Sequence, residues 1–205
     1  MIVGKWNKSV ILTYVGMAIS ILGIFLSLRA EGGVLLAISC LIVAGICDLF
    51  DGFIARKCKR TEEEKAFGIQ LDSLVDVISF IALPIAIFLG MGFQKWYHLP
   101  VYLVFAICGI ARLGYFNIQA EGKEEPVPYY TGLPVTYSAR IFPVCYLLRY
   151  VLPEQAFFTA YPILMLLVAG CNVFKWRVRK PRGLAYGFFS LLAVGMLILY
   201  LAVLS

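Results

Sequence analysis

Long uninterrupted apolar runs constrain the fold of this chain more than any other feature. Runs of about 20 apolar residues recur along its 205 residues, and a helix of that length crosses the hydrocarbon core of a bilayer. Because 61% of the residues are hydrophobic and the mean hydropathy is +0.87, a soluble domain of this length could not bury the apolar surface. The runs are continuous rather than alternating, which excludes a transmembrane β-barrel. The sequence therefore predicts an all-α, polytopic transmembrane helical bundle that forms a single domain over residues 1–205.

Turns, charges and prolines divide the chain into about seven predicted helices. They cover residues 9–28, 34–57, 66–91, 101–119, 133–150, 155–174 and 184–204. The acidic residues 62–64 are expected to form a solvated first turn leading into the third helix. Pro126 and Pro128 predict an extended connector over residues 120–131. The fifth and sixth helices are short and contain prolines, so six to eight spans are compatible with the sequence.

The distribution of basic residues predicts the orientation of the bundle. With seven spans, 14 of the 18 Lys and Arg residues fall on the side of the N-terminus. Only Arg29, Lys95 and Arg149 fall on the other side, and Arg140 lies within the fifth predicted helix. Cytoplasmic loops carry an excess of basic residues. We therefore expect a multi-pass protein of the cell (cytoplasmic) membrane, with the basic side facing the cytoplasm. We attribute the net charge of +6 to this membrane topology rather than to nucleic-acid binding.

Four aspartates at the ends of two apolar helices are the most chemically informative residues. Asp48 and Asp51, three residues apart, share one face of the second predicted helix, and Asp72 and Asp76, four apart, share one face of the third. The short polar connector folds these helices into a hairpin, so the two faces meet. Four ionised carboxylates in such a place repel strongly unless cations neutralise them. Because oxygen ligands select hard cations, the sequence predicts a site for Mg²⁺, Mn²⁺ or Ca²⁺.

The residues around these aspartates resemble the motif of the CDP-alcohol phosphotransferase family. That motif reads D-x-x-D-G-x-x-A-R, a variable gap, and then G-x-x-x-D-x-x-x-D. Its fixed positions are met by Asp48, Asp51, Gly52, Ala55, Arg56, Gly68, Asp72 and Asp76. The gap between Arg56 and Gly68 is longer than in many members of the family. The resemblance implies a helical membrane enzyme of the same type. Because the four aspartates lie at the basic side of the bundle, we expect its active site to face the cytoplasm.

The resemblance also implies a role for each aspartate. Asp48, Asp51 and Asp72 would bind a first divalent ion, and Asp48, Asp72 and Asp76 would bind a second. The ions are expected to be Mg²⁺ or Mn²⁺, two in each active site. Asp76 would in addition be the catalytic base that accepts the proton of the attacking hydroxyl group.

A second set of residues is expected from the resemblance to bind the CDP moiety. These residues are Gly52, Ala55, Arg56, Gly68, Thr13 and Ser9. Gly52 and Ala55 would let the nucleotide pack against bare backbone, and Arg56 would bind phosphate oxygens with its forked guanidinium. Thr13 and Ser9 stand where other members place polar nucleotide contacts. The alternative for such a hydroxyl is a bond to its own helix.

Two further stretches bear on the alcohol that accepts the phosphatidyl group. Residues 109–117 and 130–134 resemble the R-x-A-R-F-N and F-x-G-L-P segments of phosphatidylserine synthases within the family, with a departure at residues 113–115. The resemblance favours L-serine as the acceptor. Arg112, Asn117 and Arg140 are the candidates to bind its carboxylate. Interfacial snorkelling of Arg112 and a helix-end cap by Asn117 are the alternatives.

Together these features predict a metal-dependent phosphatidyltransferase. It would transfer the phosphatidyl group of a CDP-activated lipid, either CDP-diacylglycerol or its archaeal ether equivalent, to L-serine and release CMP. The expected partners are the CDP-activated lipid, L-serine, membrane lipids and, from the resemblance, a second copy in a homodimer; nucleic acid is not expected. The nearest alternative is a phosphatidylglycerophosphate or inositol-phosphate lipid synthase of the same family. A cation transporter is the alternative from another class, because intramembrane carboxylates also line ion pathways.

Overall fold

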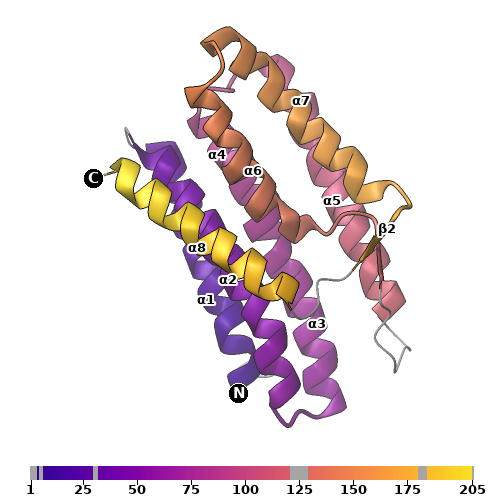
Figure 1. Ribbon diagram of the computed structural model, residues 1–205. Helices are drawn as coiled ribbons and strands as arrows, with labels where there is room; N and C mark the ends of the chain where they lie inside the picture. Colours follow the sequence, from indigo (N-terminus) through magenta and orange to yellow (C-terminus); the bar gives the residue numbers. More distant parts are fainter. Residues whose placement is uncertain (1–3, 5–6, 30–31, 121–128, 180–183, 205) are drawn as a thin grey trace.

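The chain folds into a bundle of helices that run roughly alongside one another (Figure 1). The computed structural model describes residues 4, 7–29, 32–120, 129–179 and 184–204. Its helices are α1 (Ile11–Arg29), α2 (Gly33–Lys57), α3 (Glu62–Val77), α4 (Leu83–Gly90), α5 (Leu99–Ala120), α6 (Ser138–Tyr146), α7 (Glu154–Val173) and α8 (Leu184–Leu204). A π-helical segment, Ile78–Ala82, joins α3 and α4 into one continuous helix. The predicted order of seven helices is therefore confirmed over the described residues.

Five helical stretches within the described ranges are long and apolar enough to cross a membrane. They are Lys8–Arg29, Gly33–Ala55, Glu62–Gly90, Trp96–Gln119 and Glu154–Val173. This composition confirms the prediction of an all-α multi-pass membrane protein. The fifth predicted helix is shorter than expected, because α6 is flanked by 3₁₀ turns at Val135–Tyr137 and Leu147–Tyr150. Pro143 lies inside α6 and cannot donate a backbone hydrogen bond, which weakens the helix there.

Small residues let α1 and α2 pack closely along their length. The buried residues of α1 are Thr13, Gly16, Ser20, Gly23 and Ser27. They recur every three or four positions and so occupy one face of the helix. A Cβ atom on Gly23 would lie only 2.8 Å from the Cβ atom of Cys40 on α2, so a larger residue would force the helices apart. Such stripes of small residues are typical of close helix packing in membranes.

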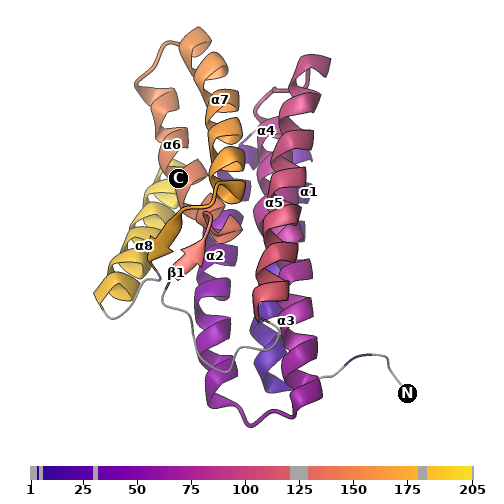
Figure 2. The ribbon, with the colours of Figure 1, turned by 90° about the vertical axis from the view of Figure 1, so that its right-hand side faces the viewer.

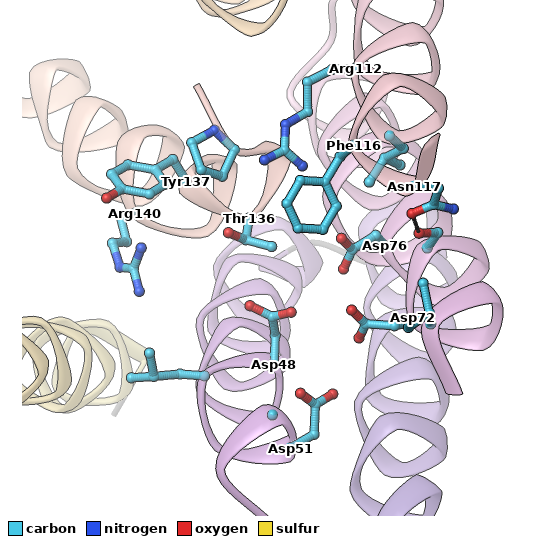
Figure 3. A pocket seen from close by; sticks show the side chains of 16 residues that line it. Asp48, Asp51, Asp72, Asp76, Arg112, Phe116, Asn117, Thr136, Tyr137 and Arg140 are labelled. Atoms are coloured by element: carbon cyan, nitrogen blue, oxygen red, sulfur yellow. Dashed lines mark hydrogen bonds between the residues drawn. The ribbon is translucent and has the colours of Figure 1, made fainter. Parts of the chain in front are cut away.

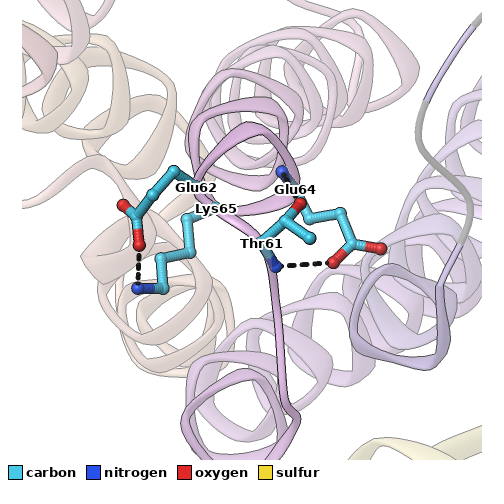
Figure 4. A network of polar contacts seen from close by, with 4 residues as sticks. All are labelled: Thr61, Glu62, Glu64 and Lys65. Atoms are coloured by element: carbon cyan, nitrogen blue, oxygen red, sulfur yellow. Dashed lines mark hydrogen bonds and ion pairs between the residues drawn. The ribbon is translucent and has the colours of Figure 1, made fainter.

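A capping box fixes the start of α3 (Figure 4). The Oγ1 atom of Thr61 accepts a hydrogen bond from the Glu64 backbone N–H at 3.2 Å, and the Thr61 backbone N–H donates to Glu64 Oε2 at 2.8 Å. An ion pair of 2.6 Å joins Lys65 to Glu62. The helix therefore begins at Glu62 rather than at Ala66, with the acidic residues in its first turn as expected.

Aromatic side chains hold α6 against α4 and α7. The rings of Phe88 and Tyr161 stack with their centroids 4.6 Å apart, and Phe142 packs edge-on against Phe88 at 5.5 Å. The Tyr161 hydroxyl donates a hydrogen bond of 2.8 Å to the Phe142 carbonyl. These contacts give α6 a fixed position relative to the rest of the bundle. Helix α8 packs against α2 and lies on the side of α6 that faces away from α7 (Figures 1 and 2).

Two three-residue strands, which the sequence did not predict, link the α5–α6 and α7–α8 connectors (Figure 2). Strand β1 (Tyr129–Thr131) pairs antiparallel with β2 (Arg177–Arg179), with Tyr130 opposite Val178. The pairing satisfies backbone groups of two connectors that lie at the same end of the bundle. The predicted extended course of residues 120–131 is thus observed at residues 129–131. Pro126 and Pro128 lie outside the described residues.

Candidate active site

The four predicted aspartates lie in one cavity, between the C-terminal half of α2 and α3 (Figure 3). Asp48 and Asp51 come from α2, and Asp72 and Asp76 come from α3, as the helical spacing predicted. The cavity has a volume of about 370 Å³. Its lining residues are Asp48, Leu49, Asp51, Gly52, Ile69, Asp72, Ser73, Asp76, Arg112, Leu113, Phe116, Asn117, Pro134, Thr136, Tyr137 and Arg140. The two acidic faces therefore meet, as the sequence required for a shared site.

Three of the four carboxylates are arranged so that one cation can bind them. Carboxylate oxygens of Asp48, Asp72 and Asp76 all lie within 4.8 Å of one another. Two oxygens bound to one Mg²⁺ at about 2.1 Å are at most about 4.2 Å apart, and two bound to Ca²⁺ at about 2.5 Å are at most about 5 Å apart. Three oxygens spaced equally around one ion are closer still, about 3.6 Å apart for Mg²⁺ and about 4.3 Å for Ca²⁺, so the carboxylates can share a divalent ion once their separations close by up to about 1 Å. Hard oxygen ligands of this kind suit Mg²⁺, Mn²⁺ and Ca²⁺.

Asp51 is placed differently from the other three aspartates. It does not belong to the group of oxygens within 4.8 Å, although it lines the same cavity and is buried. Its Oδ2 atom accepts a hydrogen bond of 3.1 Å from the Thr13 hydroxyl on α1. Thr13 therefore bonds a carboxylate on the neighbouring helix and not its own helix. The predicted role of Asp51 as a ligand of a first ion stays a prediction.

Two arginines bring positive charge to the carboxylates from the opposite wall. Arg112 on α5 and Arg140 on α6 both interact electrostatically with Asp48, and Arg112 also interacts with Asp76. Figure 3 shows both side chains reaching toward the cavity. Opposite charges at this range offset part of the repulsion within the acidic cluster. Arg112 is 7% exposed, so its side chain is buried in the cavity wall and does not snorkel to an interface.

An aromatic ring supports each of these guanidinium groups. The Arg112 guanidinium lies 5.0 Å from the ring centre of Phe116, and that of Arg140 lies 5.0 Å from the ring centre of Tyr137. Cation–π contacts of this kind hold a guanidinium plane in place while its N–H groups stay directed elsewhere. Both arginines are therefore preorganised to bind an anionic group in the cavity.

Asn117 connects two helices instead of capping its own. Its Oδ1 atom accepts a hydrogen bond of 2.8 Å from the Ser73 hydroxyl on α3, and its Nδ2 atom lies 3.5 Å from Gln70 Oε1. The side chain lines the cavity next to Arg112. Asn117 thus ties α5 to the helix that carries Asp72 and Asp76. Its predicted contact with the acceptor stays a prediction.

A backbone clip positions the connector that forms the wall near Arg140. The Gly132 N–H donates to the Trp176 carbonyl at 3.0 Å, and the Leu133 N–H donates to the Cys171 carbonyl at 2.9 Å. Gly132 has a φ of +76°, and a Cβ atom there would lie 2.4 Å from the carbonyl oxygen of Asn172. Only glycine tolerates both conditions. The clip therefore fixes residues 134–137, three of which line the cavity.

A second cavity, of about 240 Å³, adjoins the first and shares part of its wall. The two cavities have Asp51, Gly52, Ile69 and Asp72 in common. The second is lined by Ser9, Val10, Thr13, Asp51, Gly52, Ala55, Arg60, Gly68, Ile69 and Asp72. Five of the six residues predicted to bind the CDP moiety thus line one cavity next to the acidic cluster. The side chain of the sixth, Arg56, lies outside the described part of the structure.

Comparison with known proteins shows to which family the chain belongs. The profile of the CDP-alcohol phosphatidyltransferases matches residues 6–203, which is nearly the whole chain. The chain belongs to the CDP-alcohol phosphatidyltransferase family. The resemblance seen in the aspartate motif is therefore confirmed. No solved structure matches the chain significantly.

Curated relatives of this family member come from several organisms. The chain is 29% identical over 162 residues to the CDP-diacylglycerol–serine O-phosphatidyltransferase of Saccharomyces cerevisiae, covering 69% of this chain and 56% of that protein. It is 30% identical over 143 residues to the archaetidylserine synthase of Methanothermobacter thermautotrophicus, covering 69% and 59%. The Helicobacter pylori CDP-diacylglycerol–serine O-phosphatidyltransferase is 34% identical over 112 residues, covering 53% and 45%. The chain spans less than two thirds of the length of these relatives.

The sequence did not single out several residues that shape the site of this family member. Phe116 and Tyr137 are the supports of the two arginines, and Ser73 is the partner of Asn117. Phe116 lies four residues after Arg112, and Tyr137 lies three residues before Arg140 on the same helical stretch. This spacing is the only sequence signal that places a ring beside each arginine. Arg60 lies in the connector between α2 and α3, in the gap of the family motif between Arg56 and Gly68.

Proposed function

We propose that this chain transfers the phosphatidyl group of a CDP-activated lipid to the hydroxyl group of L-serine. The products would be CMP and a phosphatidylserine-type lipid. The observation that supports this best is that three carboxylates and two arginines meet in one cavity. A second cavity beside it is lined by five of the six residues predicted to bind the CDP moiety. The names of the curated relatives, which are serine phosphatidyltransferases and an archaetidylserine synthase, favour serine.

In the proposed reaction the serine hydroxyl oxygen forms a bond to the phosphatidyl phosphorus. The bond between that phosphorus and the oxygen of CMP breaks, and CMP leaves with the electron pair. Asp76, which is buried in the cavity wall, takes the hydroxyl proton. Divalent ions bound at the carboxylates would neutralise charge on the attacked and leaving phosphates. We propose Mg²⁺ or Mn²⁺, two to a site, held by the four aspartates.

Arg112 and Arg140 are proposed to bind the serine carboxylate. They are the basic residues among the described lining of the larger cavity. Two guanidinium groups match one carboxylate, whereas an acceptor such as glycerol 3-phosphate or inositol phosphate carries a more highly charged phosphate. We therefore favour serine over the phosphorylated acceptors used in the alternative family activities.

A panel of acceptors tests this assignment. Purified protein in detergent is given CDP-diacylglycerol or its ether-linked equivalent, Mn²⁺ or Mg²⁺, and one alcohol at a time, and CMP release is measured. We expect release with L-serine and background release with glycerol 3-phosphate or inositol phosphate. Release with a phosphorylated alcohol alone would refute the serine assignment. No release with any alcohol, together with nucleotide-independent cation uptake into liposomes, would favour the transporter alternative.

The base role of Asp76 has its own test. Asp48→Asn is expected to abolish both metal binding and turnover, because Asp48 contributes to the carboxylate group and to its balance with the arginines. Asp76→Asn is expected to abolish turnover with less damage to nucleotide binding. Equal binding defects in the two variants would contradict a separate role for Asp76 as proton acceptor.

The placement in the membrane is also proposed, with the site opening to the cytoplasm and two copies forming a homodimer. The excess of basic residues on one side supports the orientation. Single cysteines introduced at exposed Lys59 and Lys95, in a variant without its own six cysteines, should be labelled from opposite sides of sealed vesicles. Labelling of both from the same side would refute the topology, and a monomer by light scattering in detergent would refute the dimer.

A further inference from the structure

The connector between α2 and α3 places a guanidinium in the second cavity that the proposed chemistry does not use. Arg60 lines this cavity together with Gly68, Ser9 and Thr13. Its Nε atom is buried and has no hydrogen-bond partner among the described residues. An unpaired buried donor on a charged group is destabilising unless a ligand supplies an acceptor. An acceptor on a molecule bound in the cavity would satisfy this donor.

The local structure holds Arg60 in place. The next residue, Thr61, is the cap of α3 and is fixed by reciprocal hydrogen bonds with Glu64 (Figure 4). On the other side, an Nη1 atom of Arg60 lies 3.6 Å from the position that a Cβ atom on Gly68 would occupy. The guanidinium therefore packs against bare helix backbone. The backbone of Arg60 directly precedes the N-cap of α3, and its guanidinium lines the cavity.

The position of Arg60 relative to the acidic cluster indicates which part of a nucleotide reaches it. Gly68 precedes Asp72 by four residues on α3, and Ala55 follows Asp51 by four on α2. Four residues correspond to about 6 Å along a helix. If the phosphates bind at the carboxylates, then Ala55, Gly68 and the neighbouring Arg60 lie about one helical turn farther from the acidic cluster. That is the distance at which the nucleoside, rather than a phosphate, is expected.

We propose that Arg60 recognises the base of the nucleotide by donating two hydrogen bonds to O2 and N3 of cytosine. This inference rests on the proposed function and adds a specificity-determining residue to it. Cytosine presents two adjacent acceptors, which match the parallel N–H groups of a guanidinium. Uracil presents an N–H donor at N3, so the same pair cannot form. The small residues Gly52, Ala55 and Gly68 leave room for a flat ring beside the guanidinium.

Competition between nucleotides tests the inference. Full-length protein in detergent with Mn²⁺ is titrated with CDP, UDP and inorganic pyrophosphate, and affinities are measured calorimetrically for wild type, Arg60→Gln, Arg60→Lys and Lys59→Gln. Lys59 is the exposed neighbour of Arg60, so its variant loses the same charge without touching the cavity. We expect wild type and Lys59→Gln to prefer CDP over UDP. Both Arg60 variants should lose about 10–100-fold in CDP affinity, while affinities for UDP and pyrophosphate stay within about twofold.

Two results would overturn the inference. A similar loss of affinity for CDP, UDP and pyrophosphate in Arg60→Gln would place the guanidinium on the phosphates. Unchanged CDP affinity would exclude a nucleotide contact. Failure of the wild type to bind CDP at all with Mn²⁺ present would instead overturn the proposed function, so the two failures are distinguishable.

Discussion

Neutralising one aspartate of the cluster should have opposite effects on stability with and without metal. In the metal-free protein, Asp48 lies against the other carboxylates, whereas in the unfolded chain these groups are apart. Asp48→Asn removes one charge at nearly constant volume. We expect the variant to be more stable than wild type in EDTA, and less stable than wild type when Mn²⁺ is present.

The distance between the carboxylates sets the size of the effect. At 4.8 Å, the upper limit of the separation, two unit charges repel by about 3.5 kcal/mol with an effective dielectric constant of about 20. Arg112 and Arg140 offset part of this repulsion at Asp48. We expect a net gain of about 1–2 kcal/mol in EDTA, which corresponds to a rise in Tm of roughly 2–8 °C for a chain of this size. Mn²⁺ at 100 times its Kd should stabilise wild type by about 2.7 kcal/mol.

Thermal unfolding in detergent measures both halves of this prediction. Wild type, Asp48→Asn and Glu62→Gln are melted in EDTA and in excess Mn²⁺. Glu62 is an exposed carboxylate in a surface ion pair, so its variant should change stability by less than about 1 kcal/mol in either buffer. The reasoning is refuted if Asp48→Asn melts below wild type in EDTA. It is equally refuted if Mn²⁺ stabilises the variant as much as wild type.

Further predictions concern the supports of the site. Thr13→Val removes the hydroxyl that bonds Asp51 and should weaken Mn²⁺ binding by about 10–100-fold in a calorimetric titration, whereas Thr13→Ser should bind normally. Gly132→Ala places a methyl group 2.4 Å from the Asn172 carbonyl at a positive φ, so we expect a loss of at least about 1 kcal/mol in unfolding free energy and a raised KM for the acceptor; wild-type values for both would contradict the clip. CMP release should stop in excess EDTA and return with Mn²⁺ or Mg²⁺; full activity in EDTA would exclude a metal requirement.

The parts of the fold that follow from helical periodicity were predictable from the sequence. Spacings of three and four residues put Asp48 with Asp51 and Asp72 with Asp76, and the structure brings the two pairs into one cavity. The helices themselves follow from apolar runs whose length matches a bilayer. The cap at Thr61 also has a local signature, since Glu64 follows at the required spacing.

The remaining parts depend on contacts between distant segments, which periodicity does not encode. The hydrogen bond from Ser73 to Asn117 joins residues 44 positions apart. The pairing of β1 with β2 involves only three residues in each strand, too few to give an alternating pattern. Arg60 belongs to a gap of variable length in the family motif, so no fixed spacing marks it. Its place in a cavity emerges only when α1 is packed beside α2 and α3.

The π-helical segment Ile78–Ala82 separates two halves of one helix that serve different purposes. Asp76, just before it, is buried in the cavity wall, whereas Leu83, just after it, is buried in the apolar core. Each hydrogen-bonded ring in such a segment encloses one residue more than in an α-helix. Deleting one residue there would restore a regular helix and leave both faces in phase, whereas a deletion elsewhere rotates all later side chains by about 100°. The helix therefore has one point at which its length can change without misaligning the acidic cluster.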